Sequence, residues 1–392
     1  MMPLRRETYR FPDLPGKTFH GLPGMLADCL PDRWGNALID AWLATVGRTP
    51  GEFNVVERLC YIGTRGIGAL EFSPTTGPRP GKGSTIHVDS LVALASEILA
   101  HRASWQASFA GRRKEAALRE ILRVGTSAGG ARAKAVVAWN RTTNEVRSGQ
   151  VQFGDGFEYW LLKFDGVAGN RDRDLDDPTG YGALEFAYSL MAQSAGIRMS
   201  ECHLLEENGR RHFMTRRFDR LPGGDKLHLQ SLGALAHFDF NSAGAYSYEQ
   251  ALMTMRQLAL SMDEIEEQFR RMAFNVIARN QDDHVKNIAF LMDKAGRWSL
   301  SPAFDLTYAY NPDGDWTSRH QMSANGKRDH FTMADFRAVA RVAAMKRGRA
   351  EAIVEEVRTT AGRWQDFAHQ AGVPPGLGDV VHRNLRLRIP NS

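Results

Sequence analysis

Three polar residues in the last third of the chain have the types and the spacing that phosphoryl transfer requires. Asp282 is followed five positions later by Asn287, and Asp305 stands directly after a predicted β-hairpin made of IAFLM, the turn DKAGR and WSLSPAF. One carboxylate can orient an attacking hydroxyl and accept its proton, while an amide and a second carboxylate hold Mg²⁺ against the phosphates. A loop followed by a hairpin is expected to bring the amide and the second carboxylate to the base of one ribbon. The alternative is a polar loop with helix-capping aspartates, which the order of all three residues disfavours.

Phosphoryl transfer from a nucleotide also needs a phosphate loop and a lysine on a neighbouring strand, and both have candidates upstream. The segment GTSAGGARAK at 125–134 is glycine-rich, so its backbone N–H groups could approach a phosphate; a tight β-turn is the alternative. Lys163 lies within the apolar strand pattern EYWLLKFDG, where a lysine is costly to bury unless it is paired. Its alternative is an edge-strand lysine whose amine reaches water. Glu185, on the predicted helix that follows, could pair with it or form a surface salt bridge.

The elements that must position these residues follow from apolar periodicity and turn residues. The pattern from Leu22 to Ala44 is helical but interrupted by Pro31, which predicts two short helices. A helix is expected between Pro178 and Gly196, and Asn208-Gly209 predicts a hairpin turn between two strands. From about residue 245 onwards the pattern is mostly helical, apart from the hairpin before Asp305.

Bulk composition narrows the class of protein without identifying it. The chain has 392 residues, of which 43% are hydrophobic and 24% charged, with a net charge of +5, so two or three ordinary globular domains are expected. The three cysteines, Cys29, Cys60 and Cys202, are widely spaced and form no CxxC pair, which disfavours a disulfide framework or a zinc site and fits a reducing cytoplasm. No apolar leader and no run of about 18 apolar residues is present, so a secretory signal and a membrane span are not expected.

The motifs together resemble the HipA family of toxin kinases, over about residues 19–345. GTSAGGARAK is similar to the family's phosphate loop, KFDG to its ATP-contacting strand and RRFDR to its hinge, whereas RNQDDHVKN and AFDLTYA resemble its catalytic loop and metal-binding segment. The resemblance implies that Asp282 is the catalytic base, that Asn287 and Asp305 bind Mg²⁺, and that Ser127, or its neighbour Thr126, is autophosphorylated. It assigns ATP to Gly129, Gly130, Ala131, Arg132, Ala133, Lys134, Lys163, Arg216, Arg217, Phe218, His284, Val285, Lys286, Asn287 and Phe304. Arg216 departs from the acidic hinge residue that the family usually has.

The fold that the resemblance implies is α+β, with a two-lobed protein-kinase-like core. Residues 1–118 would form an N-terminal α/β module, shorter than in relatives with an additional strand-rich unit. Residues 119–222 would form the kinase N-lobe, with the phosphate loop and hinge, and residues 223–392 a mainly helical C-lobe with the catalytic loop. The implied function is an ATP- and Mg²⁺-dependent serine/threonine kinase that acts as the toxin of a toxin–antitoxin system and causes growth arrest. Its implied partners are a protein target such as an aminoacyl-tRNA synthetase and a small antitoxin that binds DNA.

Three other functions are less consistent with these motifs than a kinase. A catalytically silent scaffold or co-repressor that binds an antitoxin is disfavoured because Asp282, Asn287 and Asp305 are all present. A metal-dependent phosphohydrolase could use Asp282, Asp283 and His284, but the upstream candidates His203 and His212 lack ligand spacing. Direct binding of nucleic acid is disfavoured because the basic segments lack a helix-turn-helix or interleaved aromatic residues.

Overall fold

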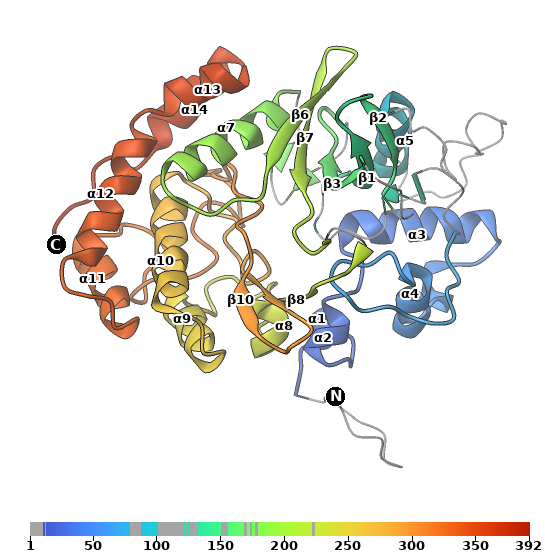
Figure 1. Cartoon of the computed structure of the whole chain (residues 1–392), viewed down its shortest axis with the longest axis horizontal. Helices are drawn as coiled ribbons and strands as arrows, with labels where there is room; N and C mark the ends of the chain where they lie inside the picture. Colours follow the sequence, from blue (N-terminus) through green and yellow to red (C-terminus); the bar gives the residue numbers. More distant parts are fainter. Residues whose placement is uncertain are drawn as a thin grey trace.

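The N-terminal part of the chain is a set of short helices, as the computed structural model shows (Figure 1). The structure describes residues 11, 13–78, 88–100, 121–122, 124–125, 130, 132–149, 156–167, 171–172, 175–176, 179–221 and 224–392. The helices are α1 (Gly16–Phe19), α2 (Gly24–Ala27), α3 (Arg33–Thr45), the 3-10 turn η1 (Pro50–Glu52), α4 (Val55–Ile62) and α5 (Val88–Ala100). The predicted interruption at Pro31 is confirmed, because it separates α2 from α3.

A five-stranded antiparallel sheet forms the next layer. Its strands are β1 (Lys134–Asn140), β2 (Glu145–Ser148), β3 (Glu158–Lys163), β6 (Cys202–Glu207) and β7 (Arg210–Arg216), in the order β2-β1-β3-β7-β6. The predicted Asn208-Gly209 turn joins β6 to β7, and both residues have the positive φ that such a turn needs. A separate short pair consists of β4 (Arg171–Asp172) and β5 (Leu175–Asp176).

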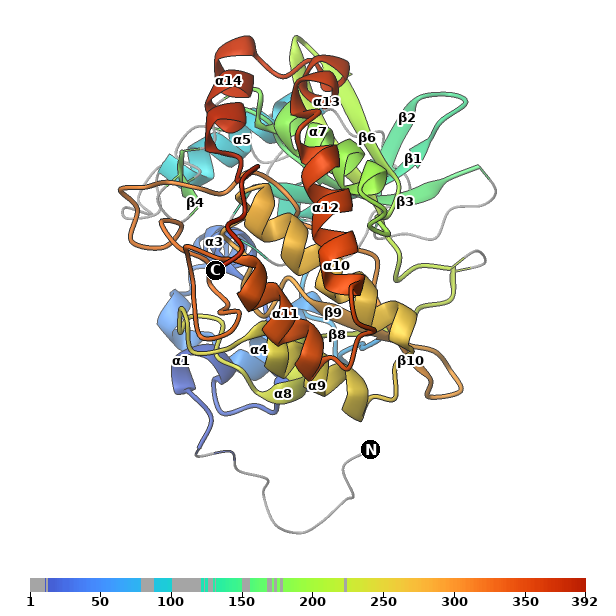
Figure 2. The same cartoon turned by 90° about the vertical axis from the view of Figure 1, so that its left-hand side faces the viewer.

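The C-terminal part is mainly helical, as predicted, and begins beyond the long helix α7 (Tyr181–Ser194). Its helices are α8 (Leu232–Ala236), α9 (Tyr248–Gln257), α10 (Met262–Ile277), α11 (Met333–Val342), α12 (Arg349–Ala361), α13 (Trp364–Ala371) and α14 (Pro375–Asn384). A three-stranded sheet, in the order β10-β9-β8, contains β8 (His228–Ser231), β9 (Ala289–Met292) and β10 (Trp298–Leu300). Strands β9 and β10 are the hairpin expected before Asp305. Figure 2 shows α11 to α14 running along one side of the molecule.

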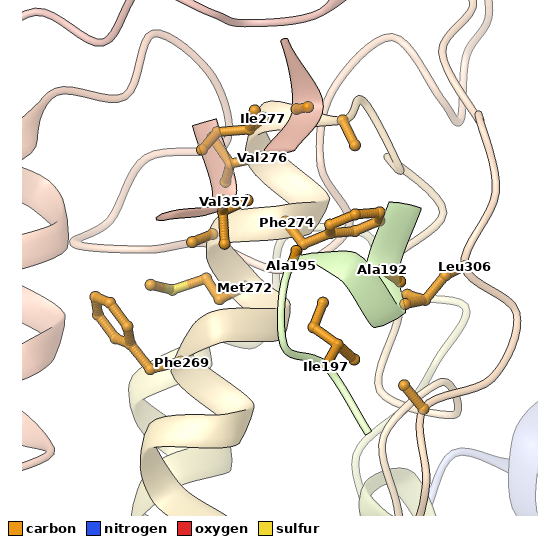
Figure 3. Close-up of a cluster of buried hydrophobic side chains, with 14 of the residues drawn as sticks. Ala192, Ala195, Ile197, Phe269, Met272, Phe274, Val276, Ile277, Leu306 and Val357 are labelled. Carbon is orange, nitrogen blue, oxygen red and sulfur yellow. The ribbon is translucent and has the colours of Figure 1, made fainter. Parts of the chain in front are cut away.

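Two large groups of buried side chains divide the structure. One joins α3 and α5 to the inner face of the five-stranded sheet, through residues such as Trp34, Ile98 and Trp160. The other fills the helical part, and Figure 3 shows some of its members, where Phe274 of α10 points toward Ala192 at the end of α7. Helix α7 therefore packs on the sheet but shares its apolar core with the helical part (Figure 1).

The N-terminal helices are fixed directly to the helical part. Gly24 of α2 lies so close to α8 that a Cβ at this position would be 2.1 Å from the carbonyl oxygen of Ala234. Beside it, Asp28 accepts hydrogen bonds from the backbone N–H and the hydroxyl of Ser231, both at 2.8 Å. Across the described ranges, no helix has the length and apolar character that crossing a membrane requires. The three cysteines are all free thiols.

Candidate active site

Asp282 lies on a loop that leaves α10 and faces the space between the sheet and the helical part. The loop is held by Gln281, whose backbone N–H donates to the carbonyl of Ala309 at 3.2 Å. The Asp282 carboxylate accepts a 2.6 Å hydrogen bond from the indole N–H of Trp316, and His284 Nε2 lies 3.9 Å from the same oxygen. Its side chain is 23% exposed, so the carboxylate is oriented by protein groups and remains accessible from the cavity.

The neighbouring Asp283 points away from this space and anchors the loop. It is buried and accepts hydrogen bonds from the Tyr248 hydroxyl at 2.6 Å and the Gln321 backbone N–H at 2.7 Å, and its Oδ2 is 2.8 Å from His320 Nδ1. Burial acts to raise the pKa of Asp283, but the His320 ring and the hydrogen bonds outweigh it and leave this pKa below its usual value. Two adjacent aspartates therefore have different surroundings: one is accessible and the other is internal.

Asn287 and Asp305 lie at the two ends of the β9–β10 hairpin, and both line one cavity. The Asn287 side-chain N–H donates to the Asp282 backbone carbonyl at 2.9 Å, which leaves the amide oxygen as its cation-binding atom. Asp305 has a left-handed backbone, with φ of 52°, a strained conformation for a non-glycine residue that occurs often at functional sites. Burial alone would raise the pKa of Asp305, but Lys163 and Lys134 hold it well below its usual range.

These two residues suit Mg²⁺ by the chemistry of their donor atoms. An ionised carboxylate and an amide oxygen are hard ligands, and Mg²⁺ commonly takes only one or two carboxylates together with water and substrate phosphates. In the part of the chain that the structure describes, no group of three or more His, Cys, Asp and Glu residues could hold a metal. The site thus offers partial coordination that phosphate oxygens would complete, rather than a closed metal cage.

Lys163 is the centre of a buried ion-pair network at the end of β3. Its amine contacts Glu185 Oε1 of α7 at 2.5 Å and also pairs with Asp305. Glu185 in turn accepts from Arg132 at 3.2 Å. Burial would lower the pKa of Lys163, but Asp305 and Glu185 raise it above its ordinary value, so the amine stays charged. The predicted Lys163–Glu185 pair is therefore present, and the network extends to Asp305.

The phosphate-loop residues are described in part. Gly130 has a φ of 98°, and its N–H donates to Asp32 Oδ2 at 2.7 Å. Lys134 is buried and stands opposite Lys163 in the β1–β3 register. Ala133 is buried in the sheet's core. Thr126, Ser127, Gly129 and Ala131, which the sequence singled out, lie outside the described residues.

The end of β7 forms the other side of the cavity. The Arg217 N–H donates to the Tyr159 carbonyl at 2.8 Å, and its side chain is buried against Asp219. Arg216 is half exposed and pairs with Glu158 at 3.3 Å. The rings of Phe218 and Phe304 lie 6.0 Å apart, and both border the cavity. An apolar slot beside a polar strand end is the kind of place where a planar base can bind.

One cavity of about 590 Å³ unites these groups, a volume typical of small-molecule sites. Among the residues that the structure describes and that the sequence assigns to nucleotide or metal binding, all line this cavity except Ala133 and Val285. Val285 is buried in the core of the helical part. The upstream histidines considered for a phosphohydrolase lie elsewhere: His203 stacks on Trp139, and His212 packs against Phe164. Neither lines the cavity.

Sequence reasoning missed two contributors. Trp316 donates to Asp282 from a loop beyond the hairpin, and Asp32 enters from the N-terminal helices to contact both Gly130 and Lys286. Asp32 precedes an apolar helical stretch and reads as an ordinary helix cap, so nothing local signals its place in the cavity.

Comparison with known proteins decides the family. A family model described as the HipA-like C-terminal domain matches residues 126–364, more than half of the chain, and one described as the HipA N-terminal domain matches residues 1–73. The chain belongs to the HipA family. No curated protein sequence matches it significantly.

Among solved structures, this HipA-family chain is similar to HipA of Shewanella oneidensis MR-1, determined in a toxin–antitoxin complex with HipB and its operator DNA. The TM-score is 0.63 at 16% identity, covering 92% of this chain and 83% of that one. A kinase of Helicobacter pylori, CtkA, matches at a TM-score of 0.33 and 12% identity, over 59% of this chain and 91% of that chain, which is too low to support an argument. The expected HipA-like, two-lobed α+β fold is thereby confirmed.

Proposed function

We propose that this HipA-family protein is an ATP- and Mg²⁺-dependent serine/threonine protein kinase that acts as the toxin of a toxin–antitoxin system. The observation that carries the proposal is the convergence of Asp282, Asn287, Asp305 and Lys163 on one cavity. These groups come from a loop, a hairpin and a distant strand, and together they match the parts that phosphoryl transfer needs. A polar loop with a purely structural purpose would not require an accessible carboxylate on the same cavity as a buried, charged lysine.

The proposed mechanism assigns one task to each group. Asp282, fixed by Trp316, orients the acceptor hydroxyl and takes its proton. Lys163, held by Glu185, would contact the nucleotide phosphates, and Asn287 and Asp305 would hold the cation. Mg²⁺ bound there would neutralise charge on the phosphates. Because the cationic groups are fixed before the substrate binds, the site needs little rearrangement as charge moves toward the leaving group.

The partners and the regulation of this kinase are part of the same proposal. A small antitoxin is proposed because the Shewanella HipA structure contains HipB together with operator DNA. In the proposal, such an antitoxin, and not this chain, would make the contact with DNA. An aminoacyl-tRNA synthetase is the proposed target. Autophosphorylation of Ser127 would add about −1.5 to −2 charges to the phosphate loop. That charge would repel the nucleotide's own phosphates and inhibit the enzyme.

The test is transfer of radiolabelled γ-phosphate from ATP, with Mg²⁺, to the protein itself and to proteins of a bacterial lysate. Asp282→Asn should reduce labelling at least 100-fold, in line with the usual effect of removing a general base. ATP binding, measured by calorimetry, should persist. Asp293→Asn is the matched control, because Asp293 makes an exposed pair with Arg297 in the turn of the β9–β10 hairpin. Ser127→Ala should remove self-labelling and leave labelling of lysate proteins intact.

Three results would contradict the proposal. Equal labelling by wild type and Asp282→Asn would remove Asp282 from the mechanism. ATP binding without any labelling in the wild type would favour the catalytically silent scaffold, and absence of both would remove the nucleotide site.

A further inference from the structure

The carboxylate of Asp32 sits where several donors for anions meet. Lys286 Nζ contacts its two oxygens at 2.8 and 2.9 Å, and the N–H of Gly130 donates to Oδ2 at 2.7 Å. Asp32 comes from the N-terminal helices, whereas Gly130 belongs to the glycine-rich segment and Lys286 to the catalytic loop. The three residues are far apart in the sequence, so only the tertiary structure brings them together.

A second cationic group, the amine of Lys134, borders the same point. A Cβ placed on Gly130 would lie 2.7 Å from Lys134 Nζ, which shows that this amine lies against the glycine whose N–H holds Asp32. Lys134 also lowers the pKa of both Asp32 and Asp305, so the two carboxylates share its field. Burial raises the pKa of Asp32, but Lys286, Gly130 and Lys134 outweigh it and keep the carboxylate ionised.

These donors are of the kind that a phosphate group uses. A backbone N–H beside a left-handed glycine and two lysine amines are suited to any compact anion, and the single N–H of Gly130 cannot donate to a carboxylate and a phosphate at once. If ATP binds as proposed above, its phosphates need the N–H of Gly130 and the amine of Lys286. The side chains of Asp32 and Lys286 are 22% and 19% exposed, so the ion pair can open towards the cavity.

We propose that Asp32 is a built-in competitor of the nucleotide's phosphates: its carboxylate occupies the phosphate donors in the nucleotide-free protein and must leave them when ATP binds. This inference rests on the proposed nucleotide site and adds a regulatory contact to it. Asp32 directly precedes α3, and the preceding helix α2 is fixed to α8 through Asp28 and Ser231. The packing of the N-terminal helices on the helical part therefore determines how firmly Asp32 is held at the phosphate donors. By linkage, a change that weakens this packing favours nucleotide binding, and bound nucleotide weakens the packing.

The test compares the binding of two probes, ATP with Mg²⁺ and adenosine, by calorimetry on the full-length protein. Asp32→Asn keeps an acceptor for the Gly130 N–H but removes the charge that holds Lys286. Asp40→Asn is the matched control, since Asp40 lies on α3 and pairs with Arg58 at 3.8 Å. Asp32→Ala serves as a second variant, and thermal unfolding checks that each protein is folded.

The expected result is a Kd for ATP about tenfold lower in both Asp32 variants, equivalent to ~1.4 kcal/mol, because the fraction of protein with its phosphate donors available rises. Adenosine, which has no phosphates, should bind equally to all the proteins, and Asp40→Asn should match the wild type. Unchanged or weaker ATP binding in folded Asp32 variants would overturn the proposal that Asp32 competes with phosphate. An equal gain in affinity for adenosine would overturn it as well. If neither the wild type nor any variant binds ATP, the proposed nucleotide site is wrong. If the wild type binds ATP and Asp32→Asn does not bind it more tightly, only the proposal for Asp32 is wrong.

Discussion

At the scale of single residues, neighbours in the sequence have opposite surroundings at this site. Asp282 accepts from one indole and remains accessible, whereas Asp283 is enclosed by Tyr248, His320 and the Gln321 backbone. The inner aspartate fixes the loop so that the outer one can be oriented without being buried. The Asp-Asp-His run could be recognised from the sequence, but which carboxylate faces the cavity depends on α9 and on the loop after the hairpin, which no local pattern places.

His212 gives a prediction about pH. Its Nδ1 accepts from the Asp165 N–H at 3.0 Å, and burial, aided by Arg210, lowers its pKa to about 4. Between pH 6.5 and 4 the unfolded chain binds a proton that the folded protein does not, so the stabilisation is complete above pH 6.5 and is lost as pH falls towards 4. The loss approaches about 3 kcal/mol, from a shift of roughly two and a half pKa units. Asn at position 212 can still accept the Asp165 N–H but cannot titrate.

Urea unfolding between pH 7 and 4.5 measures this effect. The free energy of unfolding of wild type should fall more steeply with decreasing pH than that of His212→Asn. Parallel curves for the two proteins would show that His212 is protonated in the folded state at its ordinary pKa.

At the scale of elements, the approach of α7 to the sheet positions Glu185 beside Lys163. A Cβ at Gly182 would lie 2.0 Å from the backbone carbonyl oxygen of Arg211 on β7, so only glycine permits this contact. The Gly182 N–H also donates to the buried Asp165 at 3.0 Å. The sequence predicted α7, β3 and both hairpins because each is encoded by local periodicity or by a turn. It could not predict the distance between α7 and β7, which is set by tertiary packing.

Gly182→Ala should therefore destabilise the protein by about 1–3 kcal/mol, the usual cost of overpacking a close contact. Gly376→Ala is the control, because Gly376 lies in α14 with no atom within 4 Å of an added Cβ. Thermal unfolding should show a lower midpoint for the first variant, with the second unchanged or slightly higher, as alanine favours helices. Equal midpoints would mean that α7 does not lie as close to β7 as the structure indicates.

At the scale of the whole molecule, the N-terminal helices are joined to the helical part across some two hundred residues of sequence. Gly24 against Ala234 and Asp28 against Ser231 make this junction, and Asp32 follows from it. Short motifs in the sequence were enough to predict that Asp282, Asn287, Asp305 and Lys163 belong to one site, and all four line the cavity. The junction contains no such motif, which is why the contribution of the N-terminal helices to the site was not predicted.

Substitution at Gly24 tests that junction. Gly24→Ala places a methyl group 2.1 Å from the Ala234 carbonyl oxygen and should displace α2 from α8, making the N-terminal helices more sensitive to limited proteolysis. Gly16→Ala, on the neighbouring α1 with open space around it, should leave the digestion pattern unchanged. Identical patterns for Gly24→Ala and wild type would show that the junction tolerates a wider separation.

Helix α7 also links the two apolar cores of the molecule. Leu184, Tyr188 and Met191 belong to the apolar core of the helical part, although the sequence division at residue 222 groups them with the sheet. Lys163 instead lies between Leu162 and Phe164, which are buried in the sheet's own core. The Lys163–Glu185 pair thus joins a strand that belongs to one apolar core to a helix that belongs to the other. In the proposed kinase, any movement of the two cores away from each other would stretch this ion pair, so the lysine proposed to contact the phosphates would also resist opening of the cavity.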